Sequence, residues 1–346
     1  MLPDWQQTLE SLGGRIEDGV VADFGDPSAE LAAADRGETV LADLSQRAFL
    51  TLTGSEVLSY LQGQLTNDVY PAEHGTPVLA AHLTPKGRVI AGLLVLPFEA
   101  GFAVDFPGDL AEPLTKRLTM FILRADVQLT DAADQWVRLG VSGETAAAAA
   151  AAAIGAERLT PEGTTRGSHG TAIPLPGPGP AYLLVVPPEA GRDAWTAATA
   201  EARPVGRDAW ELARIRAGVP DLGAATSETF IPQEANLEPL GGISYTKGCY
   251  TGQEVVARTK HLGRLKRQLY RLRADGPLSP GQAVHAEGEE QSRGRIVRSA
   301  PLPGGGSEAL AVLHIETVEA GTALHAEGGA ALEVLDLPYA QPALAE

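Results

Sequence analysis

The stretch Tyr245–Glu254 reads Y-T-K-G-C-Y-T-G-Q-E and holds the only cysteine in the 346 residues. A single cysteine cannot form an internal disulfide, so Cys249 is either a small buried group or a reactive thiol. Thr251 and Glu254 have the T-x-x-E spacing of a capping box, which predicts a helix that begins here and runs towards Lys260.

Cys249 lies just before the predicted start of that helix, where unpaired N–H groups and the helix dipole favour an anion. Lys247 adds a cation two residues away in the sequence. Both features favour the thiolate form, which is the reactive form of cysteine. The alternative is that Cys249 only fills space under the turn, and the local sequence leaves both interpretations open.

The composition excludes several classes of function. The 44 acidic and 27 basic residues give a formal net charge of −17, so we expect neither direct nucleic-acid binding nor membrane association. No apolar run approaches the roughly 20 residues of a membrane span, and the first residues do not resemble a signal peptide, so a cytoplasmic location is expected. One cysteine and scattered histidines predict no metal site.

The pattern of apolar residues predicts an α+β protein with two or three domains. Between residues 49 and 130 it indicates the order β-α-β-β-β-α-β, which is close to a ferredoxin-like split unit. A second α+β unit is predicted over 136–204, with a helix over the alanines 146–153. Beyond Leu269, short strands between glycine-rich turns predict a small antiparallel barrel.

Two further capping boxes, Asp109 with Glu112 and Asp208 with Glu211, predict helix starts. The second of these helices is followed by the segment 221–250, which has little periodicity. A compact domain tolerates a loop of that length mainly when the loop binds something.

Basic residues concentrate in one segment of this acidic chain, against the single acid Glu254. They are Lys247, Arg258, Lys260, Arg264, Lys266, Arg267, Arg271 and Arg273. The cluster is either a solvated helix face or a site for a polyanionic small molecule. Gln62–Val69 offers amides to a heterocycle and Gln233–Glu238 offers carboxylates to an amino-pyrimidine ring, but each also has an ordinary structural explanation.

Lys247–Glu254 matches the K-G-C-[FY]-x-G-Q-E signature, so the chain resembles the YgfZ-like folate-binding proteins. The similarity extends to Leu61–Gln64, Asn67–Val69, Phe230–Gln233, Gly241–Tyr245 and Val255–Arg258. That family is similar in fold to the T-protein of the glycine cleavage system.

The resemblance implies an α+β fold of three domains set around a central opening that binds tetrahydrofolate, with or without a polyglutamate tail. It implies a first domain over 1–48 plus 135–206 and a second over 49–134 plus 207–262. The third domain, over 263–346, would be the C-terminal β-barrel.

The resemblance also implies site residues. Cys249 and Lys247 would be the catalytic pair and would face the same opening as the folate, while the basic cluster would meet the glutamate tail. The implied folate-binding residues are Leu65, Asn67, Arg88, Glu234, Tyr245, Gln253 and Arg258.

Three functions follow from the resemblance. The first is a folate-binding factor that supports assembly or repair of iron-sulfur clusters, with client enzymes, including tRNA-modifying ones, or assembly proteins as partners. The second is a folate-dependent aminomethyltransferase or demethylase, but the positions that match the T-protein carboxylate are Ala91 and Gly92, which cannot move a proton. The third is a non-catalytic folate-binding module, so whether the protein is an enzyme stays open.

Overall fold

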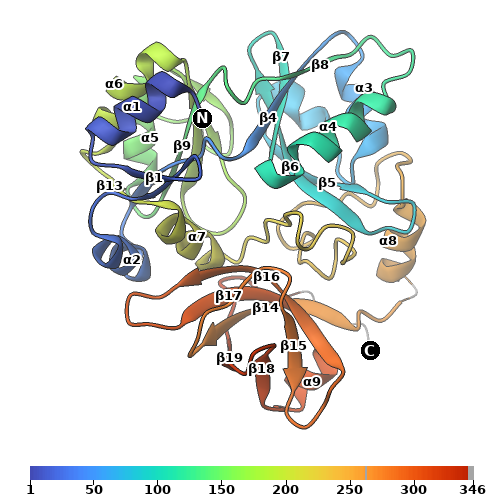
Figure 1. Ribbon diagram of the computed structural model, residues 1–346. Coiled ribbons are helices and arrows are strands. Elements are labelled where there is room, and N and C mark those ends of the chain that lie inside the picture. The colour runs from blue at the N-terminus through green and yellow to red at the C-terminus, as the bar shows by residue number, and fades with distance from the viewer. Residues whose placement is uncertain (262, 342–346) are drawn as a thin grey trace.

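The computed structural model of the protein describes residues 1–261 and 263–341. Within them the chain forms two α/β layers and a closed barrel, and the barrel lies below both layers in Figure 1. Among these residues no helix is long and apolar enough to cross a lipid bilayer. The predicted domain limits at 262 and 346 lie outside the described residues.

The first layer is a six-stranded sheet of order β10-β11-β12-β9-β3-β13. Its strands are β3 (Val40–Asp43), β9 (Val137–Ser142), β10 (Thr165–Arg166), β11 (Thr171–Pro174), β12 (Ala181–Val186) and β13 (Arg203–Pro204). One face packs on α1 (Pro3–Ser11), α5 (Ala146–Ile154) and α6 (Gly191–Ala198). The hairpin β1 (Arg15–Glu17) and β2 (Val20–Asp23) and helix α2 (Pro27–Asp35) complete this part. The predicted alanine helix is α5, and most of its alanines are buried.

The second layer is a five-stranded antiparallel sheet of order β5-β6-β7-β4-β8. Its strands are β4 (Ala48–Thr53), β5 (Val78–Leu83), β6 (Val89–Phe98), β7 (Gly101–Phe106) and β8 (Gln128–Asp131). Helices α3 (Val57–Gln64) and α4 (Ala111–Met120) share a core with one face. The element order is the predicted β-α-β-β-β-α-β.

The barrel closes in the order β14-β17-β16-β15-β18-β19. Its strands are β14 (Arg267–Ala274), β15 (Ala283–Ala286), β16 (Ser292–Pro301), β17 (Ser307–His314), β18 (Leu324–Ala326) and β19 (Ala331–Leu335), with the short helix α9 (Ile315–Glu319) before β18. The sequence does not predict β18 or α9, because each is too short to show a clear apolar periodicity. The predicted small antiparallel barrel is confirmed.

Helix α7 (Arg207–Arg216) joins the three parts, because it packs on α2, β3 and β16. After it, the predicted irregular segment runs between the second sheet and the barrel and reaches α8 (Gln253–His261) (Figure 1). One hydrophobic core contains side chains from both sheets, α7, this segment and the barrel. The inner faces of all three parts therefore meet at the centre of the molecule.

The predicted helices form, but their predicted capping boxes do not. Asp109 accepts a hydrogen bond from the Ala224 N–H, 2.8 Å away, rather than capping α4. Glu211 pairs with Arg298, and Glu254 pairs with Arg258. These side chains find tertiary or neighbouring ionic partners, which local spacing does not reveal.

Candidate functional site

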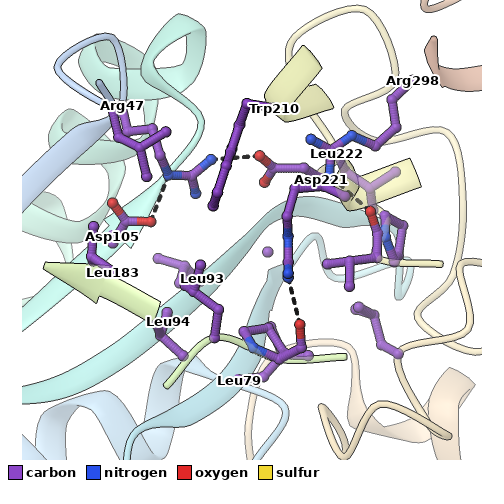
Figure 2. A pocket seen from close by; sticks show the side chains of 18 residues that line it. Arg47, Leu79, Leu93, Leu94, Asp105, Leu183, Trp210, Asp221, Leu222 and Arg298 are labelled. Carbon is purple, nitrogen blue, oxygen red and sulfur yellow. Dashed lines mark hydrogen bonds and ion pairs between the residues drawn. The ribbon is translucent and has the colours of Figure 1, made fainter. Parts of the chain in front are cut away.

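A cavity of about 70 Å³ lies where the three parts of the molecule meet. Leucines from both sheets and the ring of Trp210 form most of its wall, and Figure 2 shows charged side chains among them. The lining residues are Leu44, Arg47, Leu79, Gly92, Leu93, Leu94, Asp105, Leu175, Pro176, Leu183, Trp210, Arg214, Val219, Pro220, Asp221, Leu222, Leu237 and Arg298. Its largely apolar wall with a few charged groups is typical of a small-molecule site, although the cavity is smaller than most such sites.

Arg47 forms ion pairs with two carboxylates, and all three residues line this cavity. Arg47 donates from Nε to Asp105 at 2.7 Å and from Nη1 to Asp221 at 2.5 Å (Figure 2). Burial raises the pKa of Asp105 despite the charge of Arg47, and the Asp105 Oδ1 atom has no hydrogen-bond partner. Burial also opposes ionisation of Asp221, but Arg47 and Arg298 outweigh it and lower the pKa of that carboxyl. The cavity thus contains one unsatisfied buried acceptor.

Arg214 is a second buried arginine in the cavity lining. It is 5% exposed, donates to the Pro176 carbonyl at 2.5 Å and lies over the Trp210 ring at 5.9 Å from the centroid. Burial and the nearby Arg298 lower the pKa of Arg214 to about 10. Among the described residues no carboxylate forms an ion pair with it, so its charge is available to a ligand.

Cys249 is exposed, which rules out the interpretation that it fills space under the turn. Lys247 is half-buried and donates from Nζ to the carbonyls of Gln62 and Leu65, both at 2.6 Å. Neither Cys249 nor Lys247 belongs to the lining of the central cavity. The segment instead folds onto the outer end of the β5–β6 hairpin, where Gly87 packs against Val255. That Cys249 and Lys247 face the folate-binding opening stays a prediction.

The two predicted folate-binding residues near α3, Leu65 and Asn67, have different environments in the structure. The Leu65 side chain is fully buried in the core beneath the second sheet, so it cannot contact a ligand. Asn67 donates from Nδ2 to the carbonyls of Leu79, at 2.8 Å, and Gly241, at 2.6 Å. It lines a second cavity that shares Leu79 and Leu94 with the central one. Only Asn67 of this pair borders the open space.

Glu234 is buried, and both of its carboxylate oxygens are occupied. Arg267 donates to Oε1 at 2.9 Å, and Arg88 and Arg267 reach Oε2 at 3.3 and 3.2 Å. Glu234 therefore ties the β5–β6 hairpin to β14, and its role in binding folate stays a prediction. Arg88 is held in the same ion pair.

The remaining predicted binding residues also lie away from the central cavity. Tyr245 donates to Glu238 Oε2 at 2.8 Å, and Gln253 Oε1 accepts from the Tyr250 N–H at 3.4 Å. Arg258 is exposed and pairs with Glu254 on the same helix. No residue of the predicted basic cluster belongs to the cavity lining. The cluster consequently does not meet a ligand tail in this cavity.

Of the hairpin positions that lack the T-protein carboxylate, Gly92 lines the cavity and Ala91 is buried. The charged lining residues Arg47, Asp105, Arg214, Asp221 and Arg298 were missed from the sequence. One signal could have found one of them: Asp105 interrupts the otherwise apolar strand β7. A charge at such a position needs a buried partner or a ligand.

Comparison with known proteins gives consistent results. No protein-family model matches the chain. It is 35% identical to the tRNA-modifying protein YgfZ of Klebsiella pneumoniae (strain 342) over 71% of this chain and 75% of that protein. It is 33% identical to the tRNA-modifying protein YgfZ of Sodalis glossinidius (strain morsitans) over 87% of this chain and 93% of that protein.

Among solved structures, the fold is similar to the glycine cleavage system aminomethyltransferase T from Bartonella henselae. The TM-score is 0.74 at 15% identity, and the match covers 99% of this chain and 98% of that one. This likeness establishes the T-protein fold, and the sequence similarity establishes the family. The chain therefore belongs to the family of the tRNA-modifying protein YgfZ.

Proposed function

We propose that the protein is a folate-binding factor that supports the assembly or repair of iron-sulfur clusters in client enzymes, including enzymes that modify tRNA. The observation that carries the proposal is the central cavity, which lies at the junction of the three parts of a T-protein fold. The name of the relatives, tRNA-modifying protein, supports the link to tRNA modification.

The chemistry of the lining residues suits a reduced folate, and the cavity of about 70 Å³ would have to widen to admit a pterin ring. Leu94, Leu183 and Trp210 provide apolar and aromatic surface for a flat ring (Figure 2). The unpartnered Asp105 Oδ1 can accept from the N–H groups of an amino-pyrimidine, and Arg214 can hold an anionic or carbonyl group. When bound, a reduced folate supplies an exchangeable one-carbon unit or reducing equivalents.

Cys249 would act at a second place, on the surface. Its exposure lets a partner protein bring sulfur or a cluster, as cargo, to the thiol. Strand β6 connects the two places: Gly92 lines the cavity, and at the other end of the hairpin Gly87 packs against Val255 of α8. Occupation of the cavity can therefore affect the cysteine segment through one strand.

The folate proposal is tested by filling the cavity. A Cβ atom at Gly92 would meet no atom within 4 Å, so the backbone there accepts a side chain, and Gly92→Leu adds apolar atoms at the cavity wall. We expect at least a tenfold loss of tetrahydrofolate affinity by anaerobic calorimetry, with the melting temperature nearly unchanged. Gly304→Leu, at a position that is equally open but lies in a barrel turn, is the control and should bind normally. Equal affinity in both variants would refute the assignment of the cavity.

The role of the thiol is tested separately with Cys249→Ser. This variant should keep its tetrahydrofolate affinity but fail to restore activity of a tRNA-thiolating iron-sulfur enzyme in cells that lack the wild-type protein. Full restoration would instead support the third function, a folate-binding module without thiol chemistry.

One observation favours the aminomethyltransferase as a second candidate. Asp105, on β7, pairs in register with Leu94 of β6, so it places a carboxylate in the cavity close to the hairpin where Gly92 has none. Transfer of a one-carbon unit from an aminomethyl or N-methyl donor to tetrahydrofolate should then occur and be lost in Asp105→Asn. No turnover above the enzyme-free rate would exclude this activity for the donors tried.

A further inference from the structure

Part of the basic cluster, none of which lines the central cavity, forms an exposed strip on α8 and residues 263–266. Arg258, Lys260, Arg264 and Lys266 are all exposed on this strip. Lys86 lies beside it, because the adjacent Gly87 packs on Val255 of α8. We call these five cations the α8 strip.

The α8 strip carries a net positive charge on an otherwise acidic protein. Two carboxylates neutralise part of it: Glu254 pairs with Arg258, and Glu238 pairs with Lys260. Within the described parts of the chain, no ion pair involves the other three cations. The whole chain has a net charge of −17, so this surface differs in sign from its surroundings.

We propose that the α8 strip binds an acidic segment of a partner protein. The inference rests on the proposed function and deepens it by naming the chemistry of the partner that reaches the exposed Cys249, which lies four residues before α8. Complementary charge raises association rates and excludes partners of the wrong sign. An acidic segment that spans the strip would be held beside the thiol.

The observations favour a protein over a nucleic acid. A long polyanion would extend past the strip and meet the acidic remainder of the surface, whereas a short acidic segment would contact the strip alone. Single-stranded nucleic acids are also commonly bound by stacking on exposed aromatic rings. Among the described residues, the large exposed hydrophobic side chains are Tyr70, Met120, Phe121, Leu123 and Val334, and none belongs to the strip.

The test uses the full chain and a fluorescein-labelled decapeptide that contains five glutamates, compared with the same peptide carrying glutamines. Fluorescence anisotropy at low ionic strength should show at least tenfold tighter binding of the acidic peptide, and the difference should disappear in high salt. The triple variant Lys86→Gln, Arg264→Gln, Lys266→Gln should lose the preference. The triple control Lys116→Gln, Arg124→Gln, Arg158→Gln removes the same charge from exposed positions elsewhere and should keep it.

Equal affinity for the two peptides, or an unchanged preference in the strip variant, would overturn the proposal. Tighter binding of a decauridylate RNA than of the acidic peptide would also overturn it, in favour of a nucleic-acid surface. Tetrahydrofolate calorimetry on the same variants separates the two proposals. If folate binds but the peptides do not differ, only the partner inference fails; if the acidic peptide is preferred but folate does not bind, the proposed function fails.

Discussion

Lys247 is the residue of the signature segment whose role depends most on the tertiary structure. Its ammonium donates to Gln62 and Leu65 carbonyls at the C-terminal end of α3, where backbone acceptors lack helical partners and the dipole favours a cation. Burial lowers the pKa of Lys247 to about 8. Lys247 thus fixes the segment that carries Cys249 to the end of α3.

His82 is a second buried ionisable residue near the same turn. It is fully buried, its Nδ1 lies 3.0 Å from the Gln64 carbonyl, and Arg117 donates to its Nε2 at 2.9 Å. This arrangement requires a neutral ring that donates from Nδ1 and accepts at Nε2. Burial lowers the pKa of His82 to about 4.

We expect His82 to make the protein sensitive to acid. Because its pKa is near 6.5 in the unfolded chain and about 4 in the folded one, the unfolded state binds more protons between these values. The free energy of unfolding should fall as pH drops from 6.5 towards 4, by up to about 1.4 kcal/mol per pH unit. Urea titrations should show a flatter profile for His82→Asn, whereas the exposed His74→Asn should follow the wild type. Identical profiles for His82→Asn and the wild type would contradict this.

At the scale of elements, the cysteine segment depends on the contact between α8 and the β5–β6 turn. Gly252 has φ +82° and directly precedes α8, and a Cβ atom there would lie 2.6 Å from the Thr84 carbonyl oxygen. Only glycine allows both this left-handed backbone and this approach. Gly252 therefore sets the position of the helix.

Gly252→Ala should loosen α8. The left-handed backbone alone costs about 1–2 kcal/mol for alanine, and the clash with Thr84 adds to it. Amide hydrogen exchange should show faster exchange along α8, together with a lower midpoint in urea. Gly248→Ala, whose Cβ would meet no atom within 4 Å, should leave both measurements close to the wild type. Similar exchange in the two variants would show that the contact does not hold the helix.

At the scale of the whole molecule, buried ion pairs attach the barrel to the remaining chain. Glu308 of β17 is 1% exposed on its side chain and lies 3.0 Å from Arg216 of α7 and 3.5 Å from Arg271 of β14. Arg298 of β16 pairs with Glu211 of α7 and donates to the Val219 carbonyl at 2.8 Å. The barrel thereby closes one side of the central cavity.

Glu308→Gln should weaken this attachment. Removing one partner of a buried ion pair leaves the arginines without their counter-charge, at a cost of about 3 kcal/mol. The midpoint of urea unfolding, monitored by tryptophan fluorescence, should shift to a lower urea concentration. Tetrahydrofolate affinity should fall as well, because the cavity wall loosens. The exposed Glu319→Gln is the control. Stability equal to that of the control would mean that the barrel is held by apolar contacts alone.

The sequence by itself determined the elements, the family and the barrel. Periodicity predicted the helix-strand order from 49 to 130 and the strands after Leu269, because local apolar spacing reflects which face of an element is buried. The segment Lys247–Glu254 indicated the family, which the relatives confirm. The domain limits stay a prediction.

Only the tertiary structure decided which polar side chains meet and which surface they face. Glu234 forms ion pairs with Arg88 and Arg267. Cys249 lies outside the cavity lined by Arg47 and Asp105. Ion pairs and cavities join residues far apart in the chain, and their geometry depends on how the two sheets and the barrel pack. No local spacing encodes that packing, so a sequence reveals which residues are able to react but not which of them share a site.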